Sequence, residues 1–200
     1  MFDVAIVDYG YGNLFSVKCA CDYVGLNSTI TNNKKKILSS KSIIIPGVGS
    51  FSSAMKVIKK KKLDKIILEF NKSKKPIIGI CLGMQLMFSK SFENGVTKGL
   101  NLFKGEVVKL NTNKLNIGWS KISCEKNKNF IKLLNLKEMY FIHSYKVKTD
   151  DDRDLLALSN FKKEIFCAAV KKDNLIGLQF HPEKSGNDGI EIYKYLKKII

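Results

Sequence analysis

Residues 75–88 read Lys75-Pro-Ile-Ile-Gly-Ile-Cys-Leu-Gly-Met-Gln-Leu-Met-Phe88, with a single cysteine between an apolar run and a helical pattern. Pro76 opens the run, and the isoleucines after it are typical of a strand buried in a parallel sheet. Gly83 is expected to permit the tight turn that lifts the side chain of Cys81 clear of the sheet. Backbone N–H groups at a helix N-terminus favour a thiolate and can bind an oxyanion. The stretch therefore predicts a nucleophile elbow at Cys81, with a buried structural cysteine as the alternative.

The chain before this stretch alternates apolar and amphipathic runs. We predict strands at 2–7, 28–31 and 42–45 and helices at 14–24, 52–60 and 63–71. Such alternation is typical of an α/β fold with a mainly parallel, doubly wound sheet and right-handed crossovers.

The pattern changes after a helix expected at 84–90. Strand-like runs between polar turns follow at 105–110, 118–123, 140–147, 165–170 and 175–179, and a closing helix is expected at 188–200. These runs predict an antiparallel or mixed extension of the sheet. We see no linker, so a single domain over residues 1–200 is expected.

Positive charge is a marked feature of the composition, because 35 lysines and arginines against 18 acidic residues give a formal charge of +17. Such an excess raises nucleic acid as a partner. However, Arg153 is the only arginine, and recognition of phosphates and bases favours arginine forks. We interpret the lysines mainly as solvated surface, with binding of an acidic protein partner or an anionic substrate as the second interpretation. A nucleic-acid-binding module is a minor alternative, and we predict no nucleic-acid partner.

Five cysteines, at 19, 21, 81, 124 and 167, are odd in number and lack paired Cys-x-x-Cys spacing. This pattern argues against a disulfide framework and a zinc site, so we predict reduced thiols, no metal and no cofactor. Residues 1–7 read as a first strand, and no apolar run approaches the length of a membrane span. We predict a soluble, cytoplasmic protein without a membrane partner.

A second glycine-containing turn, Pro46-Gly-Val-Gly49, follows the strand predicted at 42–45. Glycines at the carboxyl end of a strand expose backbone N–H groups at the edge where α/β proteins place their sites. The turn is a candidate for half of an oxyanion hole. A turn whose glycines only supply positive φ is an equally simple interpretation.

A cysteine nucleophile needs a base, and the chain has only two histidines, His143 and His181. His181 lies at the end of a predicted strand and is followed by Pro182 and Glu183. Residues two apart in an extended chain point to the same side, so Glu183 can reach the imidazole of His181. His181 is therefore the better base, although a buried structural histidine is the simpler alternative for a lone histidine. The residues predict a Cys-His-Glu hydrolase that forms an acyl-enzyme.

Five segments together resemble the class I glutamine amidotransferases, and within them the glutaminase subunits of imidazole glycerol phosphate synthase. The segments are Val7-Asp-Tyr-Gly-Tyr-Gly-Asn-Leu14, Pro46-Gly-Val-Gly49, Gly79-Ile-Cys-Leu-Gly-Met-Gln85, Tyr140-Phe-Ile-His-Ser-Tyr145 and Gln179-Phe-His-Pro-Glu-Lys-Ser-Gly186. The resemblance implies that Cys81 attacks the side-chain amide carbon of L-glutamine, that His181 takes and returns the proton, and that Glu183 holds the ring. Ammonia leaves, and water hydrolyses the glutamyl thioester.

The resemblance also implies the residues that bind the substrate. Amide groups around Gly49 and Leu82 would form the oxyanion hole, with the loop that contains Gly47 moving to complete it. The remaining positions match those that hold the amino-acid end of glutamine: Gln85, Glu93, Ser144 and Tyr145. The carboxylate of Glu93 suits the α-ammonium group, and the backbone of the last two suits the α-carboxylate.

The resemblance further implies a heterodimer in which ammonia passes to a (β/α)8 barrel cyclase in histidine biosynthesis. Trp119 and Lys184 match positions that face this partner, and the positive charge of the chain is expected to help docking to an acidic barrel face. A simple core aromatic is the alternative for Trp119.

One segment departs from the pattern of these subunits, which usually reads Pro-His-x-Gly-Trp-Asn where this chain has Leu115-Asn-Ile-Gly-Trp-Ser120. We expect the change to lie near the partner face and to affect the ammonia acceptor, not glutamine hydrolysis. A paralogous subunit that supplies ammonia to a surface-polysaccharide sugar is therefore the main alternative. A cysteine peptidase or other amidase is less well supported, because it does not explain Gln85 and Glu93.

Overall fold

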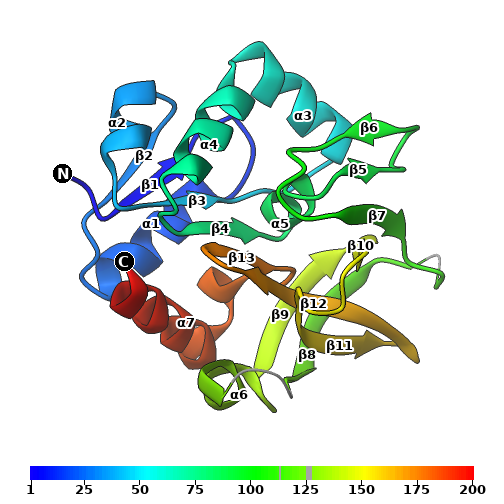
Figure 1. The fold of residues 1–200 in the computed structure, drawn as a ribbon. Helices are drawn as coiled ribbons and strands as arrows, with labels where there is room; N and C mark the ends of the chain where they lie inside the picture. The colour runs from blue at the N-terminus through cyan, green and yellow to red at the C-terminus, as the bar shows by residue number, and fades with distance from the viewer. Residues whose placement is uncertain (113, 125–127) are drawn as a thin grey trace.

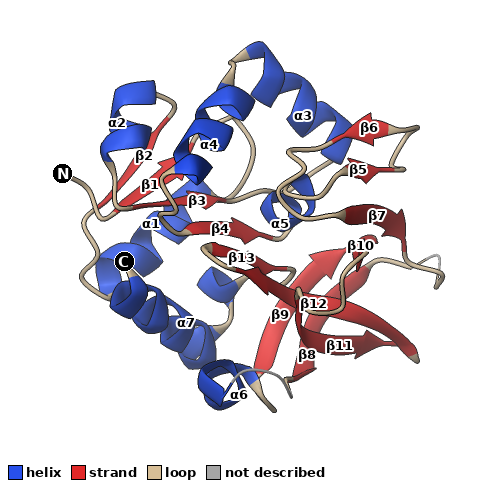
Figure 2. Ribbon diagram, in the orientation of Figure 1, coloured by secondary structure: helices blue, strands red, loops and turns tan. Residues whose placement is uncertain are grey.

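The computed structural model describes residues 1–112, 114–124 and 128–200. Within these ranges, nine strands form a main sheet with helices on both faces (Figures 1 and 2). In spatial order the strands are β2 (Ser28–Thr31), β1 (Val4–Val7), β3 (Ser42–Ile45), β4 (Ile77–Ile80), β13 (Leu175–Leu178), β12 (Glu164–Lys172), β11 (Leu155–Phe161), β8 (Asn116–Ser123) and β9 (Glu138–His143). The first five are parallel, and the others pair antiparallel.

The parallel half of the sheet separates two hydrophobic cores. β1, β3, β4 and β13 are buried along their whole length, as expected for strands covered on both faces. Val4 and Ile6 of β1 join one core, whereas Ala5 and Val7 join the other. The first core contains side chains of α1 (Leu14–Tyr23), α6 (Lys128–Leu134) and α7 (Gly186–Ile199). The second contains side chains of α2 (Lys34–Ser39), α3 (Phe51–Lys60), α4 (Leu63–Lys72) and α5 (Leu82–Leu86).

A smaller sheet lies against the second core. Its strands, in spatial order, are β10 (Tyr145–Thr149), β7 (Gly105–Lys109), β5 (Lys90–Ser91) and β6 (Thr97–Lys98). Val107 and Val147 are directly opposite each other in β7 and β10 and belong to that core. The predicted class, a mainly parallel doubly wound sheet with an antiparallel extension, is confirmed.

The helix expected at 84–90 was wrong at both ends, since α5 spans Leu82–Leu86 and residues 90–91 form β5. The cause is a tertiary contact. The N–H groups of Leu100 and Leu102 donate to the carbonyls of Leu86 and Met87, so a distant loop occupies the acceptors at the C-terminal end of the helix.

The strand expected at 140–147 is two strands. β9 ends at His143 in the main sheet, and β10 begins at Tyr145 in the smaller sheet. Ser144 therefore lies where the chain passes from one sheet to the other, directly before the strand that carries Tyr145.

None of the helices in the described part of the chain is both long and apolar enough to cross a membrane. No group of three or more His, Cys, Asp or Glu side chains there is arranged to hold a metal ion.

Candidate active site

Cys81 lies in the elbow between β4 and α5, in a backbone conformation that L-residues rarely adopt. Its φ is 53° and its ψ is −111°. The surroundings fix this conformation, because the Cys81 N–H donates to the Leu178 carbonyl at 2.7 Å and the Cys81 carbonyl accepts from the Gln85 N–H at 3.2 Å. Such a conformation costs about 1–3 kcal/mol and is found mainly at functional sites. The elbow between strand and helix that the sequence predicted at Cys81 is present.

Gly83 serves this elbow in a different way from the one expected. The positive φ belongs to Cys81, and Gly83 is not among the residues with positive φ. A Cβ on Gly83 would lie 1.7 Å from the Ile45 carbonyl oxygen, so the missing side chain lets α5 approach the end of β3. Gly79 has a similar role, since its Cβ would lie 2.7 Å from the Cα of Met84.

His181 and Glu183 form the ion pair that their spacing predicted. The His181 Nδ1 is 2.7 Å from the Glu183 Oε1, and both side chains are 1% exposed. Because a carboxylate only accepts, Nδ1 carries the hydrogen. The backbone is also held: the His181 N–H donates to the Tyr140 carbonyl at 2.9 Å, and the Ser185 hydroxyl donates to the His181 carbonyl at 2.6 Å. The second ring nitrogen, Nε2, is buried without a well-formed hydrogen bond among the described residues.

The electrostatics of this group favour a protonated imidazole. Burial lowers the pKa of His181, but the interactions of the ring with the Cys81 sulfur and the Glu183 carboxylate outweigh burial and raise the pKa from 6.5 to about 10. A protonated imidazole beside Cys81 stabilises the thiolate and holds the proton that a leaving amine needs.

A titration tests this charge state, because His143 and His181 are the only histidines and their NMR signals can be assigned by single substitutions. We expect His181 to lose its proton near pH 10. A pKa that is raised in the folded state adds stability fully below 6.5, and this contribution is lost as the pH rises through about 10. The substitution Glu183→Gln removes one cause of the raised pKa, so it should lower the pKa of His181 and flatten that fall in the free energy of unfolding. A His181 that titrates at its ordinary pKa in the wild type would contradict the assignment.

A cavity of about 290 Å³ lies in front of Cys81. It gathers residues from the Pro46–Gly49 turn, the elbow, the loop after β5 and the junction of β9 and β10. The lining residues are Val48, Gly49, Cys81, Leu82, Gln85, Glu93, Leu115, Ile142, His143, Ser144 and Tyr145. All the predicted substrate-binding residues are among them except Gly47.

Gly47 lies behind the lining, where the turn meets the loop at residues 8–13, which contains Gly12. A Cβ on Gly47 would lie 2.4 Å from the Tyr9 hydroxyl, which donates to the Pro46 carbonyl at 2.5 Å. Gly12 is also close, since its Cβ would lie 3.3 Å from the Cα of Gly47. The loop at residues 8–13 therefore supports the turn that carries Gly49.

Gln85 is hydrogen-bonded to Gln179, for which the sequence predicted no role. Its Nε2 donates to the Tyr145 carbonyl and to the Gln179 Oε1, both at 3.0 Å. Gln179 is fully buried, and its own Nε2 lies 3.8 Å from the Cys81 Sγ. Gln179 precedes His181 by two residues, and this spacing at the end of an extended strand was the available signal.

Glu93 is fixed by a helix N-terminus. Its Oε2 accepts a 2.6 Å hydrogen bond from the N–H of Phe51, the first residue of α3. A carboxylate is stabilised at that end of a helix. Glu93 therefore presents a negative charge at a fixed place in the cavity wall.

The segment at 115–120 was expected to lie near the partner face. The structure places only part of it on an outer surface. Leu115 lines the cavity, and Asn116 is buried with its Nδ2 2.9 Å from the His143 Nε2. Ile117 and Trp119 of the same strand are 56% and 54% exposed. The first two positions thus belong to the wall of the site, and the strand then continues onto an open surface.

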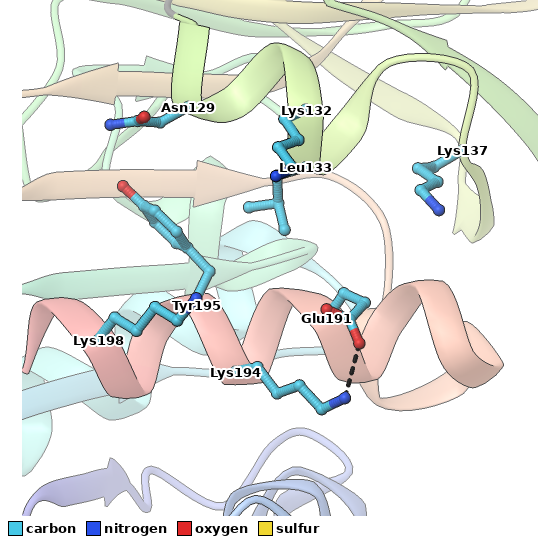
Figure 3. A pocket seen from close by; sticks show the side chains of 8 residues that line it. All are labelled: Asn129, Lys132, Leu133, Lys137, Glu191, Lys194, Tyr195 and Lys198. Atoms are coloured by element: carbon cyan, nitrogen blue, oxygen red, sulfur yellow. Dashed lines mark hydrogen bonds and ion pairs between the residues drawn. The ribbon is translucent and has the colours of Figure 1, made fainter.

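A larger hollow of about 540 Å³ lies between α6 and α7 (Figure 3). Its charged side chains are four lysines and one glutamate, Glu191, which pairs with Lys194 at 2.7 Å. The hollow shares no lining residue with the cavity at Cys81, and no predicted site residue lies in it.

Comparison with known proteins gives the same class as the geometry. The family described as "Glutamine amidotransferase class-I" matches residues 5–194. "Imidazole glycerol phosphate synthase subunit HisH" of Caldanaerobacter subterraneus is 42% identical over 98% of both chains. The HisH subunit of Oceanobacillus iheyensis is 40% identical over 98% of this chain and 99% of the relative. A solved structure, PurLQS from Thermotoga maritima, has a TM-score of 0.79 and 21% identity over 99% of both chains, which supports the fold alone.

The chain belongs to the class I glutamine amidotransferases and is an enzyme of that class. Within the family it is of the HisH type, because relatives with that name match it over almost its whole length. The predicted resemblance is confirmed, and the alternative with a surface-polysaccharide sugar as acceptor is not favoured.

Proposed function

We propose that this HisH-type chain is the glutaminase subunit of imidazole glycerol phosphate synthase, and that residues 1–200 form one catalytic domain. The observation that carries the proposal is Cys81 at a strained elbow, electrostatically coupled to a buried His181–Glu183 pair and open to a cavity of about 290 Å³. The proposed setting is the cytoplasm, where free cysteines stay reduced.

The reaction begins with the proton on His181 and a thiolate on Cys81. The thiolate attacks the side-chain amide carbon of glutamine, and the N–H groups of Gly49 and Leu82 receive the oxyanion. His181 gives its Nε2 proton to the leaving nitrogen, so ammonia departs and a thioester remains. Neutral His181 then takes a proton from the water that attacks the thioester, and glutamate leaves as the thiolate and the protonated ring are restored.

The amino-acid end of glutamine is recognised by other residues of the cavity lining. Glu93 supplies a fixed carboxylate for the α-ammonium group. The backbone at Ser144 and Tyr145 supplies the place for the α-carboxylate, and Gln85 anchors it through the Tyr145 carbonyl.

Ammonia passes to a (β/α)8 barrel cyclase that forms a heterodimer with this chain. The surface that supports this role is next to the cavity, where exposed Ile117 and Trp119 continue from Leu115. Trp119 packs edge-on against Tyr140 with ring centroids 5.9 Å apart, and the Lys184 Nζ lies 5.9 Å from the centroid of the same ring. An apolar aromatic centre with a lysine beside it suits a partner with an acidic rim.

The test measures ammonia release from glutamine by the purified chain, alone and with a candidate barrel subunit and its nucleotide ligand. We expect the barrel with its ligand to raise the rate by about tenfold or more, a common size of coupling between two sites. Glutamine hydrolysis that ignores the barrel and its ligand would contradict the proposed acceptor. No hydrolysis under any of these conditions would contradict the glutaminase itself.

A further inference from the structure

Asn116 and His143 form a hydrogen-bonded pair inside the wall of the cavity. They are directly opposite each other in β8 and β9, and they are 1% and 5% exposed. The Asn116 Nδ2 lies 2.9 Å from the His143 Nε2, and the His143 Nδ1 lies 2.9 Å from the Tyr145 carbonyl oxygen. One imidazole ring thus connects β8 to the segment that faces the substrate.

The partners of His143 decide which ring nitrogen carries the hydrogen. A carbonyl oxygen only accepts, so Nδ1 is the donor to Tyr145. Burial, with a smaller contribution from the charge of His181, lowers the pKa of His143 from 6.5 to about 4. The ring is therefore neutral at pH 7 and carries one N–H. Nε2 must then accept, and the amide of Asn116 is its donor.

The Tyr145 carbonyl is held from two sides, because the Gln85 Nε2 also donates to it at 3.0 Å. The preceding Ser144 carbonyl accepts from the Leu110 N–H at 2.9 Å. The C=O and N–H groups of one residue in an extended strand point to the same side. The hydrogen bonds to the Tyr145 carbonyl therefore also fix the direction of the Tyr145 N–H. Ser144 and Tyr145 both line the cavity at this point.

We propose that Asn116 is a positioning residue for glutamine: it holds His143 in the neutral Nδ1–H form, and His143 holds Tyr145 in the orientation that receives the α-carboxylate. The proposal rests on the proposed glutaminase function. It gives the departure from the usual segment at 115–120 a role in substrate affinity.

The test measures glutamine binding by calorimetry in the Cys81→Ala chain, where binding is not followed by turnover. Asn116→Leu keeps the number and branching of the side-chain heavy atoms but removes the donor, and we expect the Kd for glutamine to rise about tenfold, as the loss of a buried hydrogen bond implies. Ser120→Ala is the matched control, since Ser120 lies on the same strand opposite Met139. It should leave the Kd unchanged.

A second measurement, the ¹⁵N NMR spectrum of the His143 imidazole, distinguishes a positioning role of Asn116 from a contribution to stability alone. The imidazole ¹⁵N spectrum of the wild-type chain should show the proton of neutral His143 on Nδ1. Asn116→Leu should shift the Nε2 resonance toward that of a nitrogen without a hydrogen-bond donor, because it removes the amide that donates to Nε2.

The measurements distinguish failure of the positioning proposal from failure of the proposed glutaminase function. An unchanged Kd in a folded Asn116→Leu chain overturns the proposal, and so does a wild-type His143 with its proton on Nε2, even if the variant does not fold. If the Cys81→Ala parent fails to bind glutamine both alone and with the barrel subunit and its ligand, the proposed function is at fault and the positioning proposal falls with it.

Discussion

The Cys81→Ala chain should lose glutamine hydrolysis by about 10⁴-fold or more, the loss seen when a covalent nucleophile is removed. The thioester can form only on the Cys81 Sγ, because this is the single thiol in the lining of the cavity. Ser144 and Tyr145 are the hydroxyl-bearing side chains in that lining. Neither is among the groups that raise the pKa of His181, whereas Cys81 is. Without the sulfur the thioester intermediate cannot form, so the substitution should abolish this route of hydrolysis.

The measurement follows glutamate and ammonia release, with thermal unfolding as the check on the fold. The matched control is Cys21→Ala, because Cys21 is also a buried thiol but lies in the core on the inner side of α1. We expect this control to lose some stability and to keep turnover. Undiminished hydrolysis by the Cys81→Ala chain would contradict the assignment of the nucleophile.

Much of the parallel half of the fold could be predicted, because the information is local. The runs at 28–31 and 42–45 each have three β-branched residues after a serine, and they became strands with those bounds. Short or mixed elements were missed. α2 (Lys34–Ser39) is largely lysine, and β5 and β6 have two residues each. These elements depend on what packs against them, and no periodic pattern could reveal them.

The arrangement of the proposed catalytic residues could be predicted for a similar reason. Cys81 follows a strand directly, and Glu183 follows His181 by two residues, so each relation is contained in a short segment. The Asn116–His143 pair was missed because it depends on the register between β8 and β9. The contact of Gln179 with Cys81 was missed because it depends on the pairing of β13 with β4. Neither register can be read from one segment alone.

The Gly83→Ala chain should lose both stability and glutamine hydrolysis, because the new methyl group would clash with the backbone of Ile45. Its Cβ would lie 1.7 Å from the Ile45 carbonyl oxygen and 2.7 Å from the carbonyl carbon. Both atoms belong to the backbone at the end of β3, so neither can move away by rotating a side chain. The helix α5 must shift instead, and the shift passes to Cys81, which directly precedes this helix and has a φ of 53°. We expect a destabilisation of about 3 kcal/mol or more, at the upper end of the cost of overpacking.

A matched glycine separates this effect from simple crowding. Gly177 is also buried in the sheet, directly opposite Gly79, but a Cβ there would meet side-chain atoms of Met84 and Val170, the two nearest at 2.7 Å. Because side chains can rotate, Gly177→Ala should cost less, about 1–3 kcal/mol, and should keep measurable glutamine hydrolysis. The two variants are compared by denaturant unfolding and by ammonia release at saturating glutamine. Equal losses in both variants would mean that the close approach of α5 to β3 does not set the geometry of the elbow.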